Sequence, residues 1–173
     1  WYQVARVLVC LVDIYDRVYD HPAMEEPSSV PGLTRRQNIE KNLLLNGAKY
    51  CFEQSHHSTR LHNGQADYLR GVLAVGVLLD IPEYITWPVD GACGIRAMLA
   101  NNLDRDGQYY ETSNGYGLHT RNLYLSFAEP LRNYHGRVYS EGLNLYDDSR
   151  FQAFMLLPQM ALVCLGHDAS IGD

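Results

Sequence analysis

Apolar residues recur every three or four positions along most of this 173-residue chain, and no segment alternates convincingly with a period of two. The first spacing is typical of amphipathic helices and the second of half-buried strands. In the first segment, from Tyr2 to Tyr19, the apolar positions at helical spacing are Val4, Val7, Leu8, Leu11, Ile14, Tyr15 and Val18. The sequence therefore predicts an all-α fold.

Proline and polar stretches divide the chain into six predicted helices. These cover about residues 2–19, 35–53, 65–80, 89–103, 118–134 and 149–165. Thr34 is the expected N-cap of the second helix, and Asp147-Asp148 are expected to cap the sixth. Pro82 breaks the chain after the third helix, while Pro130 and Pro158 interrupt the fifth and sixth. Successive antiparallel helix pairs of this kind suit a bundle or a toroid built from helical hairpins.

Composition indicates one ordinary globular domain, with 46% hydrophobic and 20% charged residues. The formal net charge of −6 argues against nucleic-acid binding, which normally needs a basic face. The apolar run after Trp1 is too short to span a bilayer, so no membrane partner is expected. Because the chain begins within a helical pattern, we expect it to be an excerpt from a longer protein.

The stretch from Asp106 to Tyr116 combines an acidic turn, three tyrosines and one glutamate. Its Asp-Gly and Asn-Gly pairs predict turns, because glycine accepts a positive φ without steric penalty. The tyrosines also suit simple packing in the core. A tyrosine acts as an acid or base only if neighbours lower its pKa from about 10. His119 and Arg121 follow closely enough to be such neighbours.

Other polar groups give weaker predictions. His56, His57 and His62 have no recognisable metal-ligand spacing, so we expect loop histidines and no metal. The glycines match neither a phosphate-binding nor a dinucleotide pattern, so no cofactor is expected. Cys10 and Cys164 lie in apolar runs and are expected to be buried free thiols.

On its motifs the chain resembles the catalytic α/α-toroid region of heparinase II/III-like polysaccharide lyases, which include the oligoalginate lyases. The stretch Asp106–Tyr116 is similar to the family pattern of Asp-Gly, aromatic, Glu, Ser and then a catalytic Tyr. Upstream, His62-Asn63 and the apolar helix after it resemble the segment with the family's Asn-His pair, in reversed order. Downstream, residues 166–173 resemble the border with a following β-rich domain.

The resemblance implies that residues 1–173 are part of an α/α toroid whose C-terminal β-rich domain lies elsewhere in the same parent chain. The implied reaction is β-elimination at a uronic acid, which leaves an unsaturated sugar end. Asn63 would neutralise the uronate carboxylate, His62 would help or act as base, and Tyr116 would act as acid or base. The implied substrate-binding residues are Glu111, Tyr110, His119, Arg121, Arg60 and His57, with Arg70 a further possible carboxylate clamp.

The same resemblance implies an acidic polysaccharide or oligosaccharide substrate, a periplasmic or extracellular location, and an isolated chain that is inactive. Two alternatives stay open. A glycoside hydrolase on a similar toroid would use two carboxylates among Asp104, Asp106 and Glu111. A non-catalytic carbohydrate-binding toroid would fit the reversed order of His62 and Asn63.

Overall fold

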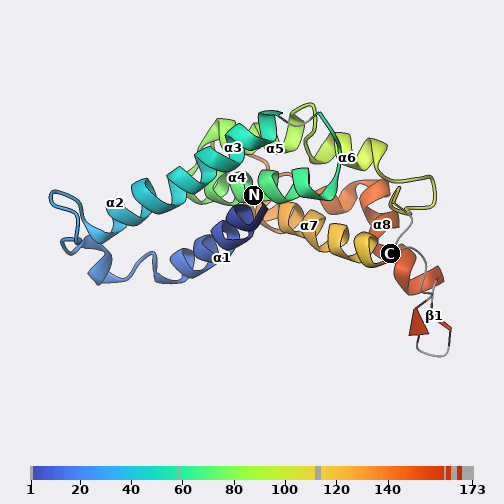
Figure 1. Cartoon of the computed structure of the whole chain (residues 1–173), viewed down its shortest axis with the longest axis horizontal. Coiled ribbons are helices and arrows are strands. Elements are labelled where there is room, and N and C mark those ends of the chain that lie inside the picture. The colour runs from blue at the N-terminus through green and yellow to red at the C-terminus, as the bar shows by residue number, and fades with distance from the viewer. Residues whose placement is uncertain (1, 58, 112–113, 162, 165–166, 169–173) are drawn as a thin grey trace.

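The computed structural model of the chain describes residues 2–57, 59–111, 114–161, 163–164 and 167–168, and it confirms the all-α class (Figure 1). Two short strands, β1 (Val163–Cys164) and β2 (His167–Asp168), pair in antiparallel register near the end. Strands of two residues leave no alternating pattern in a sequence, so they were not predictable from periodicity.

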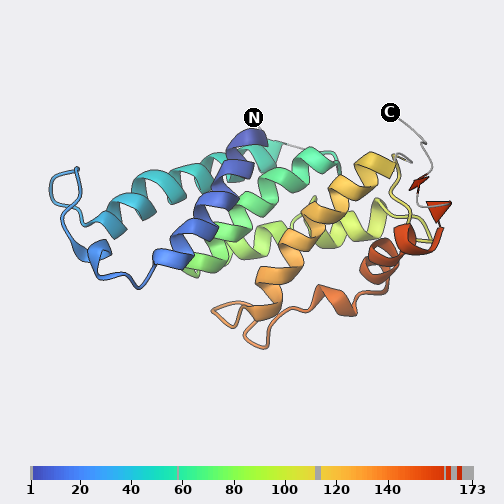
Figure 2. The same ribbon diagram turned by 90° about the horizontal axis from the view of Figure 1, so that it is seen from below.

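Three parallel helices form the layer on which the rest of the fold is built (Figure 2). They are α1 (Tyr2–Val18), α4 (Asn63–Leu79) and α7 (Asn114–Asn133). Near their N-terminal ends, Arg6 of α1 contacts both Asp67 of α4 and His119 of α7. Near their C-terminal ends, all three helices line a common cavity. The three N-termini therefore share one end of the molecule.

The remaining helices run in the opposite direction and complete the three helical hairpins. The first antiparallel helix is continuous and consists of α2 (Arg35–Ile39), a π-helical segment (Glu40–Leu45) and α3 (Asn46–His57). The second consists of α5 (Pro82–Asp90) and α6 (Ile95–Asn101), and the third is α8 (Ser149–Ala161). Short 3₁₀ segments at Pro22–Glu25 and Leu145–Asp147 lie in the connections.

Several predicted helix ends are confirmed. Thr34 caps α2 in a complete capping box, in which its side chain accepts from Gln37 N–H and the Gln37 side chain accepts from Thr34 N–H. Asp148 Oδ1 accepts from two backbone N–H groups at the start of α8, at 2.8 and 3.1 Å. Asp80 ends α4 in the left-handed region, with φ of 51°.

Two predicted boundaries are wrong. The helix expected at 89–103 contains only the last two residues of α5, a turn at residues 91–94 and the whole of α6, and α5 itself begins at Pro82, which was expected only to break the chain. Proline is tolerated there since the first N–H groups of a helix have no internal partner. Asn114-Gly115 opens α7 instead of forming a turn, and α7 continues through Pro130 to Asn133.

The core consists of two clusters on opposite sides of α4. Leu69 and Leu73 pack with the group that includes Tyr124 and Phe127 of α7. Val72 on another face of α4 belongs to the cluster formed with α1 and α3. Because α4 is covered on both sides, it is the helix that fixes where its neighbours lie.

Helix α1 is covered on one side only. Leu8 and Tyr15 are buried, whereas Val7 and Ile14 are 56% and 58% exposed. Cys10 is also exposed, so the prediction of a buried thiol there is wrong, and the side chain of Cys164 lies outside the described residues. A wide apolar face shows that a helix can pack, but it does not show how many neighbours it has.

Candidate functional site

The candidate site lies at the end of the layer where α1, α4 and α7 begin (Figure 2). His62 immediately precedes α4, Asn63 is its first residue, and Tyr116 lies in the first turn of α7. Tyr116 follows the adjacent pair His62-Asn63 by more than 50 positions in sequence. They share one end of the fold because α4 and α7 are adjacent parallel helices.

A tight hairpin brings the residues before α7 to this end. Asp104 Oδ1 accepts from the backbone N–H groups of Asp106 and Gln108 at 2.9 and 2.8 Å, and Gly107 turns the chain with φ of +88°. The backbone of Tyr110 then pairs with Asn102 at 2.9 Å. The Asp-Gly turn predicted from the sequence is therefore confirmed.

The hairpin divides its two tyrosines between the core and the surface. Tyr109 is buried beside Phe154, in agreement with simple core packing, and burial raises its pKa far above the ordinary value. Tyr110 is 51% exposed and donates a hydrogen bond to Glu111 Oε1 at 3.1 Å. Desolvation, followed by the bond to Glu111, raises the pKa of Tyr110, so neither phenol is an effective base at neutral pH.

His62 caps α4 through its side chain. Its Nδ1 accepts a hydrogen bond from Gln65 N–H at 3.3 Å. An accepting Nδ1 carries no proton, so the neutral ring presents Nε2–H as a donor. Partial burial lowers the pKa of His62, nearby Arg60 lowers it further, and Glu111 opposes both. The neutral form therefore dominates at pH 7, and Arg60 and Glu111 lie within electrostatic reach of the ring.

A partly buried ion-pair network joins α1, α4 and α7 one helical turn beyond His62 and Asn63. Arg6 donates from Nε and Nη2 to Asp67 Oδ2 at 3.1 and 2.8 Å. Arg70 Nη2 lies 2.8 Å from Asp67 Oδ1. Arg6 Nη2 also lies 3.5 Å from His119 Nε2. The Asp67 side chain is 1% exposed, and two guanidiniums against one carboxylate leave a net positive charge here.

Sequence reasoning missed Arg6 and Asp67. The available signal was a carboxylate on a helix that is otherwise apolar, because an unpaired charge is rarely buried. A buried carboxylate predicts a cationic partner, but the sequence does not show which residue that partner is. The partner is 61 residues away on another helix.

Exposed tyrosines surround this end of the layer. Tyr2, Tyr110 and Tyr116 are 41%, 51% and 42% exposed. The ring of Tyr2 lies over Gly64, where an added Cβ would come within 2.4 Å of it, and its centroid is 6.3 Å from that of His62. Exposed aromatic faces beside polar donors are suited to stacking on a sugar ring.

The structure does not bring every predicted site residue to this end. Arg121 lies 5.3 Å above the ring of Phe154 on α8, and burial lowers its pKa. His119, two residues earlier, contacts α1 instead, so the two side chains serve different faces of α7. His57, in contrast, is exposed at the last position of α3, which returns to this same end five residues before His62.

The prediction that His56 and His57 lie in a loop is wrong, because they are the last two residues of α3. His56 stacks on Trp87, with ring centroids 3.8 Å apart, and its Nδ1 lies 2.8 Å from the Phe52 carbonyl oxygen. Among the residues that the structure describes, no group of three or more His, Cys, Asp or Glu side chains is placed to hold a metal ion.

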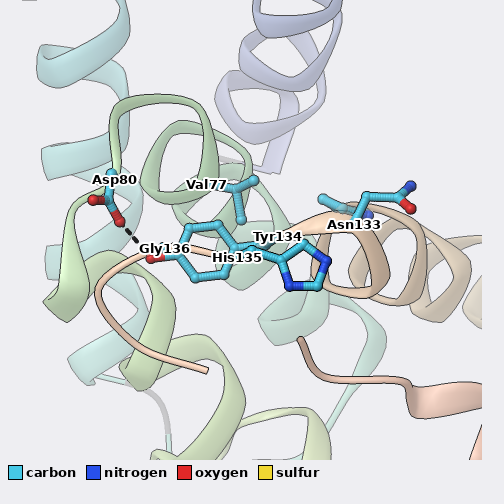
Figure 3. A pocket seen from close by; sticks show the side chains of 7 residues that line it. Val77, Asp80, Asn133, Tyr134, His135 and Gly136 are labelled. Atoms are coloured by element: carbon cyan, nitrogen blue, oxygen red, sulfur yellow. Dashed lines mark hydrogen bonds between the residues drawn. The ribbon is translucent and has the colours of Figure 1, made fainter. Parts of the chain in front are cut away.

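A second cavity, of about 480 Å³, lies at the opposite end of α4 and α7 (Figure 3). Its polar wall is occupied by internal contacts, since Asp80 accepts from the hydroxyl of Tyr134 and from Arg137 N–H and pairs with the Arg137 guanidinium. These bonds lower the pKa of Asp80, with Tyr134 the largest cause. They fasten the segment after α7 to the corner between α4 and α5.

Searches against protein-family models, curated proteins and solved structures find no match to the chain. Within the described residues, no helix is both long and apolar enough to cross a membrane.

Proposed function

We propose that the chain forms part of the catalytic region of a polysaccharide lyase that cleaves a uronic-acid-containing glycan by β-elimination. The observation that carries this proposal is the shared location of His62-Asn63 and Tyr116 at the starts of two adjacent parallel helices. Glu111, in the same motif as Tyr116, is within electrostatic reach of His62, which supports a shared site for two of the three stretches that carry the resemblance; the third, residues 166–173, lies mostly outside the described residues.

The reaction needs a group that stabilises charge on the uronate. The C5 proton is removed, its electron pair forms the C4–C5 double bond, and the C4–oxygen bond breaks. Negative charge grows on the carboxylate during this step, and hydrogen-bond donors fixed beforehand stabilise it. Asn63 supplies an amide donor, and the Nε2–H of neutral His62 supplies a second. This tautomer suits the helping role of His62, whereas the role of base requires the tautomer with its lone pair on Nε2.

Tyr116 handles the protons in this scheme. Its phenol protonates the departing glycosidic oxygen while His62, as base, takes the C5 proton; in substrates of the opposite C5 configuration, the Tyr116 phenolate takes the C5 proton and then passes it to the departing oxygen. At 42% exposure it is accessible to a bound chain. The hydrogen bond that Tyr110 donates to Glu111 orients the segment that precedes α7.

The arrangement of helices is consistent with the wider proposal. Three hairpins with parallel inner helices and antiparallel return helices are what an arc of an α/α toroid requires. By the same resemblance, the protein acts in the periplasm or outside the cell, with a β-rich domain of the same parent chain as its intramolecular partner.

A carbohydrate-binding toroid without catalysis is the second candidate, and the three exposed tyrosines at this end favour it. It shares the sugar-binding surface with the lyase but does not need the Tyr116 hydroxyl. A hydrolase using Asp104 or Asp106 is less well supported, because Asp104 is engaged in the hairpin turn.

The deciding experiment compares the chain with its Tyr116→Phe variant, using Tyr19→Phe as a matched control because Tyr19 is also exposed but lies beyond the other end of α1. Alginate, heparan sulfate, hyaluronan and pectate are each incubated with the protein, alone and extended by any flanking sequence in its gene. Ultraviolet absorbance of an unsaturated uronate that is lost only in Tyr116→Phe supports the lyase. Glycan binding by folded protein without such absorbance, in either form, refutes it and favours the binding toroid.

A further inference from the structure

Arg6 differs from the other described arginines near the site in how it is held. Both its Nε and its Nη2 donate to one oxygen of Asp67, yet its side chain is 41% exposed. The guanidinium is therefore fixed on one edge and accessible on another. A surface arginine without such an anchor loses more side-chain freedom when it binds a ligand.

The charge balance of the network favours an anion. Asp67 is nearly fully buried and faces Arg6 on one oxygen and Arg70 on the other. Arg70 is only 17% exposed, so Arg6 is the more accessible of the two cations. His119 contacts Arg6 at Nη2, the nitrogen that also donates to Asp67, and adds no negative charge.

The network is also correctly placed relative to the candidate catalytic residues. Asp67 follows Asn63 by four positions on α4, and His119 follows Tyr116 by three on α7, so each lies on the same helix face, one turn further along. One turn of helix is about 5 Å. A ligand group at Arg6 would thus lie next to a sugar held at the helix starts.

Arg70 also lines the cavity of about 500 Å³ that lies between the three parallel helices toward their C-terminal ends, together with Val9, Ala74 and Pro130. Asp13 and Asp16 line the same cavity, so its lining carries negative charge as well. An acidic group is therefore favoured at Arg6 and disfavoured further along the layer.

We propose that Arg6 binds an anionic group of the glycan, a carboxylate or a sulfate ester, and that Asp67 is the positioning residue that holds it. This inference rests on the proposed function for the identity of the ligand as an acidic glycan. It does not depend on bond cleavage, because binding at Arg6 needs no proton transfer.

Binding is measured by calorimetry with three probes: trigalacturonic acid, a sulfated glucose trisaccharide that lacks carboxylates, and neutral cellotriose. Arg6→Gln is expected to weaken binding of the acidic probes by about 10- to 100-fold, the range for losing a hydrogen bond to a charged group, and to leave cellotriose unchanged. Arg6→Lys keeps the positive charge but lacks the paired N–H donors of the guanidinium, so an intermediate loss of affinity for the acidic probes is expected. Arg17→Gln is the matched control, since Arg17 is also on α1 but is 74% exposed and lies near the other end.

Asp67→Asn separates positioning from simple charge. The substitution adds one net positive charge, so a purely electrostatic role predicts tighter binding of the acidic probes. Loss of the anchor predicts weaker binding instead, with thermal unfolding used to verify that the variant is folded.

The outcomes separate this inference from the lyase proposal. Arg6-dependent binding without an unsaturated product overturns the lyase but supports the anion site, and the stronger of the two acidic probes identifies carboxylate or sulfate. Equal effects of Arg6→Gln and Arg17→Gln, or no binding of either acidic probe to the unmodified chain, overturn the anion site.

Discussion

The turn at Gly107 allows a sharp test of how the hairpin before α7 is held. Gly107 and Gly32 both have left-handed backbones, with φ of +88° and +81°. A Cβ added at Gly32 would meet nothing within 4 Å, whereas one added at Gly107 would lie 2.5 Å from the carbonyl carbon of Ala153 and 2.7 Å from its oxygen. The two positions therefore share the backbone strain and differ in the clash with α8.

The magnitudes follow from these two terms. A left-handed conformation costs a non-glycine residue about 1–2 kcal/mol, and the smaller entropy of the unfolded alanine chain offsets roughly 0.4–1 kcal/mol. Gly32→Ala should then lower the free energy of unfolding by about 0–1.6 kcal/mol. Gly107→Ala adds about 1–3 kcal/mol of overpacking against a helix backbone that cannot rotate away, for a total of roughly 1–5 kcal/mol.

Urea unfolding followed by circular dichroism measures both losses. In a chain of this size, 1 kcal/mol corresponds to about 2–4 °C in Tm, so a thermal scan should show the same order. Equal losses in Gly32→Ala and Gly107→Ala, within about 0.5 kcal/mol of each other, would refute the close packing of the hairpin on α8.

Three further predictions concern the helices. Thr34→Ala removes the capping box and should lower the free energy of unfolding by about 1 kcal/mol in urea titrations; no change would mean that the cap adds nothing to stability. Phe127→Ala empties a fully buried site between α4 and α7 and should cost about 3–5 kcal/mol by the same assay, and a loss under 1 kcal/mol would contradict that burial. His62 has a folded-state pKa below its unfolded value of about 6.5, so the unfolded chain binds more protons between those values and stability rises with pH there. His62→Asn retains a good N-cap and should flatten this part of the pH profile; an unchanged slope would show that His62 does not cause it.

Local features of the fold were predictable because their causes lie within a few residues. The cap at Thr34, the turn at Gly107 and the cap at Asp148 each depend on hydrogen bonds that span at most four positions. The effect of a proline was predicted incorrectly where it depends on the position of the proline within or before a helix. Pro82 ends one helix and begins the next, and no local pattern distinguishes these two roles.

The candidate site was only partly predictable for a related reason. The motifs placed His62, Asn63 and Tyr116 in connections before helices expected at 65 and 118, whereas the helices begin at Asn63 and Asn114. The pairing of Arg6 with Asp67 could not be predicted, because it depends on which helices pack side by side and in what register. The same packing directs Arg121 toward α8, although it is only two residues from His119.

The common direction of α1, α4 and α7 also has an electrostatic consequence. Each helix carries a dipole equivalent to about half a positive charge at its N-terminus, and here three such termini share one end. The antiparallel return helices place their negative ends there as well, and α3 ends at His57, so the dipoles within each hairpin largely offset one another. A positive potential at that end of a chain with a formal net charge of −6 must therefore come from side chains, chiefly the guanidiniums of Arg6 and Arg70, and added salt would weaken their attraction for an acidic ligand.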